Sequence, residues 1–228
     1  MIGGAVGTTV VLLSRGPKSE PPAWSRWQPT GDDTVRIQQI AEHVGKKYRL
    51  SDGRQLDAVI ASHPRVQNLP IAAIAIKPRQ TDVNQGIAVT RADRSWAFNL
   101  CGLAKDCSIE AGTPGEPRGR LLRREALELA LYTFKYVPSS ETVVTFLPPA
   151  GGNTLYALFF DKDSLRRQLT RPLRMTIPVE SATATEENPG APPETIDRLT
   201  VPHIYKYGIR QAPDGNAVLV LDPLAIGG

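Results

Sequence analysis

The sequence has few of the residues that build metal and redox sites. Its 228 residues include only two cysteines and three histidines. Cys101 and Cys107 do not form a CxxC pair, and no second pair exists to complete a four-sulfur zinc site. None of His43, His63 and His203 has a second histidine or a cysteine at metal-ligand spacing, and the HExxH pattern is missing. The sequence therefore predicts no metal site and no cofactor.

Motifs that hold phosphates or carry a nucleophile are missing as well. The glycines of "IGGAVG" do not fit the dinucleotide fingerprint, and no strand–helix–strand unit contains them. No Walker loop and no G-x-S-x-G elbow is present. Ser62 precedes His63, but neighbouring residues of a strand point to opposite faces, so one cannot serve the other as a base. The enzymatic alternative that stays open is a hydrolase whose unrecognised cleft uses His63 or His203 with a distant aspartate.

No apolar run is long enough to span a bilayer. The uncharged run from Ile2 to Leu13 is shorter than the roughly 20 residues that a transmembrane helix needs. It also lacks the basic start of a signal peptide. A Pro- and charge-rich stretch follows it. We interpret residues 1–13 as a truncated membrane anchor and residues 14–31 as a linker without periodicity. Trp24 and Trp27 in this linker mark a membrane interface or attach the linker to the domain, and both interpretations stay open.

The remaining residues have the composition of a globular domain. Hydrophobic residues make up 41% and charged residues 22% of the chain, which argues against disorder of the whole chain. The net charge is +4. We expect residues 32–228 to form one domain, interrupted at 179–198 by a mobile acidic, Pro-rich loop. The segment that follows this loop reads as a β-hairpin, which cannot be stable alone and must join the main sheet.

Two helices are expected from hydrophobic periodicity. Residues 31–50 place Ile37, Ile40 and Val44 on one apolar face, with Asp32 at the start where it can cap free amides. Residues 120–137 carry a wider apolar face, which is typical of a central helix packed on a sheet. A short third helix is expected within 161–173, with Asp163 as its N-cap.

The strands read mainly as hairpins. Residues 48–62, 68–79, 86–102, 141–149, 154–161 and 200–224 contain strand-like stretches separated by turn residues. In the third of these, Trp96, Phe98 and Leu100 share one face. Because hairpins outnumber strand–helix–strand units, the sequence predicts an α+β fold. It should have a mixed, mainly antiparallel sheet, two main helices packed on one side, and the short third helix.

The cysteines are expected to form a disulfide. Gly102 helps the five residues between Cys101 and Cys107 to turn, and a bridge would imply an oxidising compartment. Two unconnected thiols are the alternative.

Two arginine clusters suggest an anion-binding surface. If the long and the short helix share a face, eight guanidinium groups gather on it, and each can bind a phosphate or carboxylate at two points. The eight residues are Arg118, Arg120, Arg123, Arg124, Arg166, Arg167, Arg171 and Arg174. The interpretation that we favour from the sequence is an ordinary solvated helix face, with an anionic envelope partner second and nucleic acid third. The clusters lack interleaved aromatic residues, which argues against nucleic acid and favours an envelope protein or an anionic polymer as partner.

Taken together, the apolar run, the linker and the cysteine pair predict a location. We expect a domain tethered to the cell membrane on its extracytoplasmic side. Its expected function is that of a non-enzymatic interaction or accessory domain of the cell envelope. It would work through a sheet edge or through the arginine-rich face.

Overall fold

The computed structural model describes residues 23–66, 69–79, 86–112, 114–149, 154–178 and 183–224. The expected anchor at 1–13 lies outside these residues, as does the linker up to residue 22. Parts of the loops between strands also lie outside them. Within the described part of the chain, no helix is both long enough and apolar enough to cross a membrane.

The helices follow the predicted order, with one addition. They are α1 (Asp33–Gly45), α2 (Glu116–Tyr136), α3 (Arg166–Leu169) and α4 (Pro193–Thr200). Single turns of 3₁₀-helix occur at η2 (Ala92–Arg94), η3 (Lys105–Cys107), η4 (Leu173–Met175) and η5 (Val201–His203). The strands are β1 (Asp57–Ser62), β2 (Arg65–Val66), β3 (Leu69–Ile76), β4 (Ala88–Arg91), β5 (Ser95–Gly102), β6 (Thr142–Phe146), β7 (Tyr156–Asp161), β8 (Ile204–Gln211) and β9 (Ala217–Pro223).

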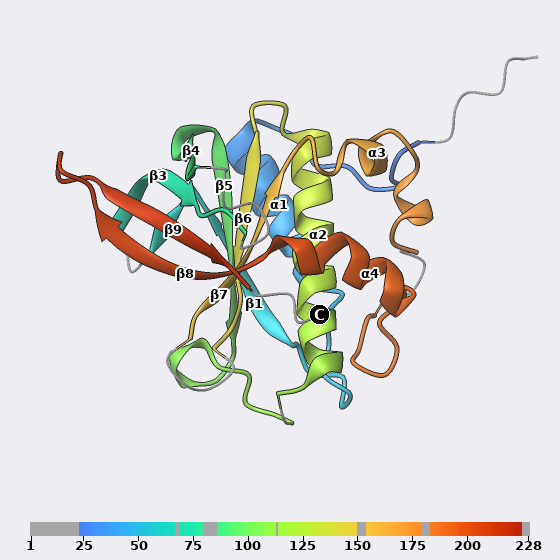
Figure 1. The fold of residues 1–228 in the computed structure, drawn as a ribbon. Coiled ribbons are helices and arrows are strands. Elements are labelled where there is room, and N and C mark those ends of the chain that lie inside the picture. Colours follow the sequence, from blue (N-terminus) through green and yellow to red (C-terminus); the bar gives the residue numbers. More distant parts are fainter. Residues whose placement is uncertain are drawn as a thin grey trace, which may run out of the picture.

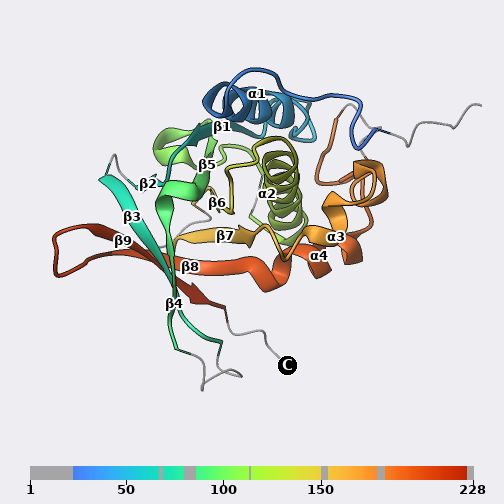
Figure 2. The ribbon, with the colours of Figure 1, turned by 90° about the horizontal axis from the view of Figure 1, so that it is seen from above.

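All these strands belong to one mixed sheet, which confirms the predicted fold class. Its order is β1-β5-β6-β7-β8-β9-β3-β2, and β4 pairs with β3. Among the described pairs of these strands, only β5 with β6 and β3 with β9 are parallel. The sheet curls strongly (Figure 2), so that it is nearly barrel-shaped. Its end strands β1 and β2 are separated in the chain by only His63 and Pro64.

The helices cover one side of the curled sheet. Figure 2 shows α2 beside the sheet, with α1 on one flank, packed also on β1, and α3 and α4 on the other. As predicted, Trp96, Phe98 and Leu100 of β5 all lie in the core on this side. Ala97 faces the opposite way, into a second apolar core enclosed by the curl. The C-terminal hairpin of β8 and β9 joins the sheet through β7 and β3. This is expected, because an isolated hairpin is not stable. The β8–β9 hairpin extends away from the helices (Figure 1).

Two local expectations about the first helix are confirmed. The Asp32 carboxylate accepts a hydrogen bond of 2.9 Å from the amide of Val35 and so caps α1. Ile37, Ile40 and Val44 are all completely buried.

The long helix is more buried than predicted. Every residue from Leu121 to Phe134 is buried, including the charged ones. The interpretation of its arginine face as solvated is therefore wrong. The reason is that α1, the loop after it, and α4 with the segment before it cover the side of α2 that the sheet does not.

Two further expectations need correction. The region 179–198 is not a continuous loop, because residues from Pro193 onwards form α4. This helix buries only Ile196, Leu199 and Thr200, too few residues for an apolar pattern to stand out. Asp163 does not cap α3, which begins at Arg166 without a side-chain cap. The carboxylate of Asp161 instead accepts from the Ser164 amide.

Candidate functional site

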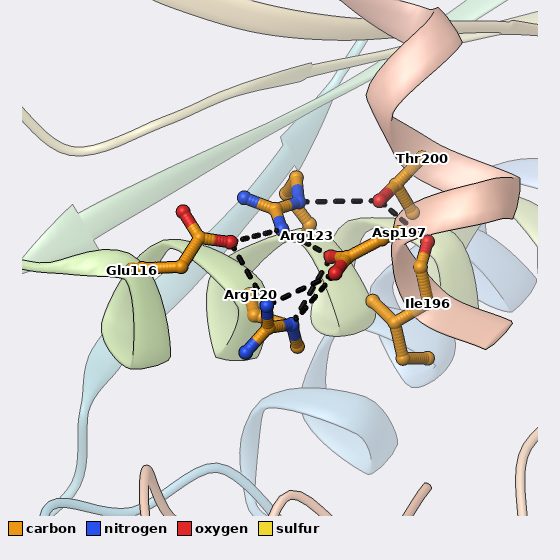
Figure 3. A network of polar contacts seen from close by, with 6 residues as sticks. All are labelled: Glu116, Arg120, Arg123, Ile196, Asp197 and Thr200. Carbon is orange, nitrogen blue, oxygen red and sulfur yellow. Dashed lines mark hydrogen bonds and ion pairs between the residues drawn. The ribbon is translucent and has the colours of Figure 1, made fainter. Parts of the chain in front are cut away.

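The eight arginines fall into two groups with different surroundings. The group on α2 faces carboxylates and hydroxyls of this same chain. Figure 3 shows Arg120 and Arg123 around the carboxylate of Asp197 on α4. Glu116, one turn earlier on α2, accepts from both guanidinium groups. The hydroxyl of Thr200 completes the cluster, accepting from Arg123 at 3.2 Å.

The other two arginines of α2 are also engaged within the chain. Arg118 donates to Glu186 at 2.7 Å. Arg124 is only 2% exposed and donates to the hydroxyl of Tyr48 at 2.8 Å. Together these contacts attach α4, the segment before it and the segment after α1 to α2. The structure thus gives this arginine group a role in holding elements together, and it does not bring it beside the second group to form one face.

A buried ionic network continues from Arg124 toward α1. Glu128 has no exposed surface, accepts from the Tyr48 hydroxyl at 2.8 Å and pairs with the ammonium group of Lys47. Burial by itself raises the pKa of Glu128, but Lys47 and Arg124 outweigh this effect and hold the pKa below its usual range. Burial also raises the pKa of Tyr48 far above its usual range, so its hydroxyl stays protonated as a donor.

Two more acidic groups lie deeper. Asp57 of β1 and Glu125 of α2 are fully buried, and apart from one another their carboxyl groups have no hydrogen-bonding partner among the described residues. Burial raises the pKa of Asp57 to about 7, and it raises that of Glu125 well above the usual range, with a further contribution from Asp57. One proton held by Glu125 and donated to Asp57 satisfies both groups, whereas two ionised carboxylates would repel one another.

The network opens outward into a pocket lined with aromatic rings. This aromatic pocket has a volume of about 260 Å³ and is formed by Ala23–Trp27, His43, Lys47, Tyr132, Leu173 and Arg174. The rings of Trp27 and His43 are stacked with centroids 3.8 Å apart, and Tyr132 meets both edge-on. Burial, helped by Lys47, lowers the pKa of His43 to about 4, so its imidazole is neutral at neutral pH.

The two linker tryptophans therefore attach the linker to the domain. Trp24 is buried, packs edge-on against Tyr132 and Tyr136, and donates from Nε1 to the carbonyl oxygen of Gln168 at 3.3 Å. Trp27 forms one wall of the aromatic pocket. The sequence leaves open whether these tryptophans mark a membrane interface or attach the linker to the domain. The contacts of their side chains fit attachment to the domain.

The second arginine group reaches this pocket through Arg174. Arg166 pairs with Asp163, and Arg171 donates to the Thr176 hydroxyl at 3.2 Å. Arg167 and Arg174 are exposed, and Arg174 lines the aromatic pocket. This surface, with its tryptophans and cations, is our candidate functional site.

A second cavity lies on the concave side of the sheet. It measures about 430 Å³, and its lining is mainly apolar, from strands β1, β5 and β6 and the segments beside them. Asn99, Tyr207 and Arg65 supply polar groups. Cys107 also lines this cavity and forms a disulfide with Cys101, as predicted; the Cα atoms are 4.4 Å apart.

The histidines occupy structural positions. His63 stacks on Trp96 with ring centroids 4.2 Å apart. The Nδ1 atom of His203 lies 3.0 Å from the carbonyl oxygen of Phe159, and the ring packs against Phe160. Burial lowers the pKa of His203. Among the described residues there is no cluster of three or more potential metal ligands.

Sequence reasoning missed the buried network because its members are spread over 82 positions of the chain numbering, from Lys47 to Glu128. The one local signal is the pair Glu125 and Glu128, which lies near Arg123 on the helix face that the sequence suggests is solvated. Comparison of this chain with protein-family models, with curated proteins and with solved structures finds no match.

Proposed function

We propose that this protein is an extracytoplasmic interaction or accessory domain of the cell envelope, tethered by its N-terminal segment. The observation that carries the proposal is the disulfide between Cys101 and Cys107, which involves the only cysteines of the chain. Stable disulfides form in oxidising compartments and are rare in a reducing cytosol.

The attachment of the linker supports a tether. Leu173 donates from its amide to the carbonyl oxygen of Trp24 at 2.7 Å, so the linker is bound by backbone as well as by side chains. An apolar run that ends at Leu13 lies only ten residues before Ala23. This order of apolar run, short linker and docked tryptophans is what a domain held close to a membrane requires.

The two surfaces available for partners are now distinguishable. The arginines of α2 are engaged inside the chain, so they are not offered to a partner. The edge strand β4 exposes Val89, and its outer edge is not paired within the described residues. The second surface available for partners is the basic surface around the aromatic pocket. The contacts of His63 and His203 favour no hydrolytic mechanism, so we propose no enzymatic function.

Labelling in cells tests the location. In a Cys101→Ser, Cys107→Ser background, Asp214→Cys places one thiol at the exposed tip of the β8–β9 hairpin. We expect a membrane-impermeant maleimide to label this thiol in intact cells, and the protein to sediment with membranes. The same background without the added cysteine is the control. Labelling only after lysis, together with a soluble protein whose native cysteines are reduced, would refute the proposal.

A further inference from the structure

We propose that the surface around the aromatic pocket binds the headgroups of anionic phospholipids. We call it the basic-aromatic surface and define it by Trp27, Lys135, Arg167, Arg174 and Met175, which lie near the buried Trp24. The inference rests on the proposed tether, because it names what the tethered domain contacts next to its attachment point. It assigns a ligand class to the second arginine group, the four arginines outside α2.

The charge of this surface is one-sided. Residues 163–176 hold four arginines and one aspartate, and that aspartate is paired with Arg166. Lys135 adds an exposed ammonium group 5.7 Å from the centre of the Trp24 ring. Nearby Lys47 is excluded from the count, because Glu128 neutralises it. Each cation close to an anionic bilayer contributes about 1 kcal/mol to binding.

An apolar side chain stands among the cations. Met175 is 62% exposed and directly follows Arg174, while Leu173 of the same turn is buried and fixes its position. An exposed methionine beside arginines is poorly explained by a soluble anion, which has no apolar part. It fits the boundary between headgroups and acyl chains, where apolar side chains insert and cations meet phosphates.

The surface lies next to the end of the linker that the structure describes. Trp24 is hydrogen-bonded to both Gln168 and Leu173, so the end of the linker and the basic segment form one packed unit. From Leu13 to Ala23 the chain can extend at most about 36 Å. A membrane that held the apolar run would therefore lie within reach of this surface. The β8–β9 hairpin, by contrast, projects from the opposite side of the domain (Figure 1).

The bilayer is favoured over nucleic acid for two reasons. The rings of Trp27 and His43 already stack on one another, so the faces turned toward each other are not available to bases. An exposed methionine also adds nothing to phosphate recognition. Nucleic-acid binding is therefore an outcome of the test and not part of the proposal.

Vesicle binding by the full chain tests the inference. Co-sedimentation is measured with vesicles of phosphatidylcholine alone and with vesicles that also contain phosphatidylglycerol. We expect phosphatidylglycerol to strengthen binding, and added salt to weaken that gain. Arg174→Glu should reduce the gain at least about fivefold, since it removes one cation and adds an anion. Met175→Asp should reduce it further.

Matched controls separate local from general effects. Arg210→Glu makes the same charge change on the distant hairpin, and Val89→Asp makes a comparable change at an exposed apolar residue of β4. Both should leave most of the gain intact. Equal losses in Arg174→Glu and Arg210→Glu would overturn the inference by showing a response to net charge alone.

The two proposals can fail separately. Binding to phosphatidylcholine without any gain from phosphatidylglycerol refutes the headgroup site and leaves the tether untouched. A gain that depends on Arg174 and Met175, combined with labelling only in lysed cells, supports the site and refutes the location. If Arg174→Glu weakens binding to a DNA duplex but not to the anionic vesicles, the surface is a nucleic-acid site and the inference is wrong.

Discussion

The carboxyl groups of Asp57 on β1 and Glu125 on α2 face one another inside the core, and neither has any exposed surface. No lysine or arginine is paired with either one among the described residues. The neighbouring Glu128 differs, because Lys47 and Arg124 compensate its charge. The same stretch of α2 thus holds one acid that is stable when ionised and another that is stable when protonated.

The paired acids make stability depend on pH. The folded-state pKa of Asp57, about 7, exceeds its ordinary value of 3.8, so between these values the folded protein binds more protons than the unfolded chain. The free energy of unfolding that the pair contributes is therefore full at acidic pH and falls as the pH rises through about 7. The slope for one proton is about 1.4 kcal/mol per pH unit. Asp57→Asn should flatten this fall in urea unfolding measured between about pH 5 and pH 8.

The conservative replacement at Glu125 controls for this result. Glu125→Gln should also flatten the profile, since the proton shared by the pair is then replaced by an amide hydrogen. Profiles of both variants that run parallel to the wild-type profile would show that the two acids do not titrate in this range.

Glu128, unlike Asp57 and Glu125, should stabilise the fold in its ionised form. Glu128→Gln keeps the shape of the side chain but leaves two cations without their anion. We expect a loss of about 3 kcal/mol in the free energy of unfolding at neutral pH. Glu42→Gln breaks an exposed pair with Lys46, in which both side chains are 72% exposed, and should cost less than about 0.5 kcal/mol. Similar losses in the two variants would contradict the network.

Much of the fold follows from local patterns. The stripe that contains Ile37 and the alternation of Trp96, Phe98 and Leu100 are periodic signals, and the structure buries these faces as expected. The position of Asp32 just before an amphipathic stretch predicts that it is an N-cap. Such features depend on residues only a few positions apart, so they can be predicted from the sequence.

The candidate site does not follow from such patterns, because its contacts join distant segments. From the sequence, Arg120 is expected among solvated arginines. In the structure Asp197 lies beside it, on a helix with only three buried residues. Trp24 looks like part of an extended linker until Gln168 accepts its indole hydrogen. Each case depends on long-range pairing, which charge and periodicity within one segment cannot reveal.

The cluster between α2 and α4 should control the local stability of α4. Asp197→Asn removes the charge that Arg120 and Arg123 share, and Asp197 is itself 31% exposed, so we expect a loss of only about 1–2 kcal/mol. Hydrogen exchange of the α4 amides should accelerate about tenfold, with little change in β5 and β6. Asp163→Asn breaks the exposed pair with Arg166 and should leave exchange unchanged. Uniform acceleration over the whole domain would argue against a local role.

Reduction of the disulfide should have a modest effect centred on one loop. The ring closed by Cys101 and Cys107 is short, which limits its contribution to about 2 kcal/mol. Asp106 and Cys107 both have positive φ, a backbone conformation that the bridge holds in place. The double variant Cys101→Ser, Cys107→Ser should therefore unfold at lower urea concentration and exchange faster around 102–108. Unchanged exchange in this loop would show that the bridge does not order it.

Gly45, at the end of α1, is expected to resist replacement because of Val59. Alanine normally stabilises a helix relative to glycine by up to about 1 kcal/mol. Here a Cβ atom would stand 2.8 Å from Cγ2 of Val59 on β1, too close for ordinary contact. Gly45→Ala should therefore lower the free energy of unfolding by about 1–3 kcal/mol. Gly208→Ala, at a strand position with open space around it, should be nearly neutral.

A double-mutant cycle isolates the contact between α1 and β1. If the Val59 side chain is the obstacle, Gly45→Ala should cost much less in a Val59→Ala background than in the wild type. The coupling between the two substitutions should then be favourable by about 1 kcal/mol or more. If the two costs are additive, the loss comes from the helix end itself, and the close approach of Gly45 to β1 does not limit this position.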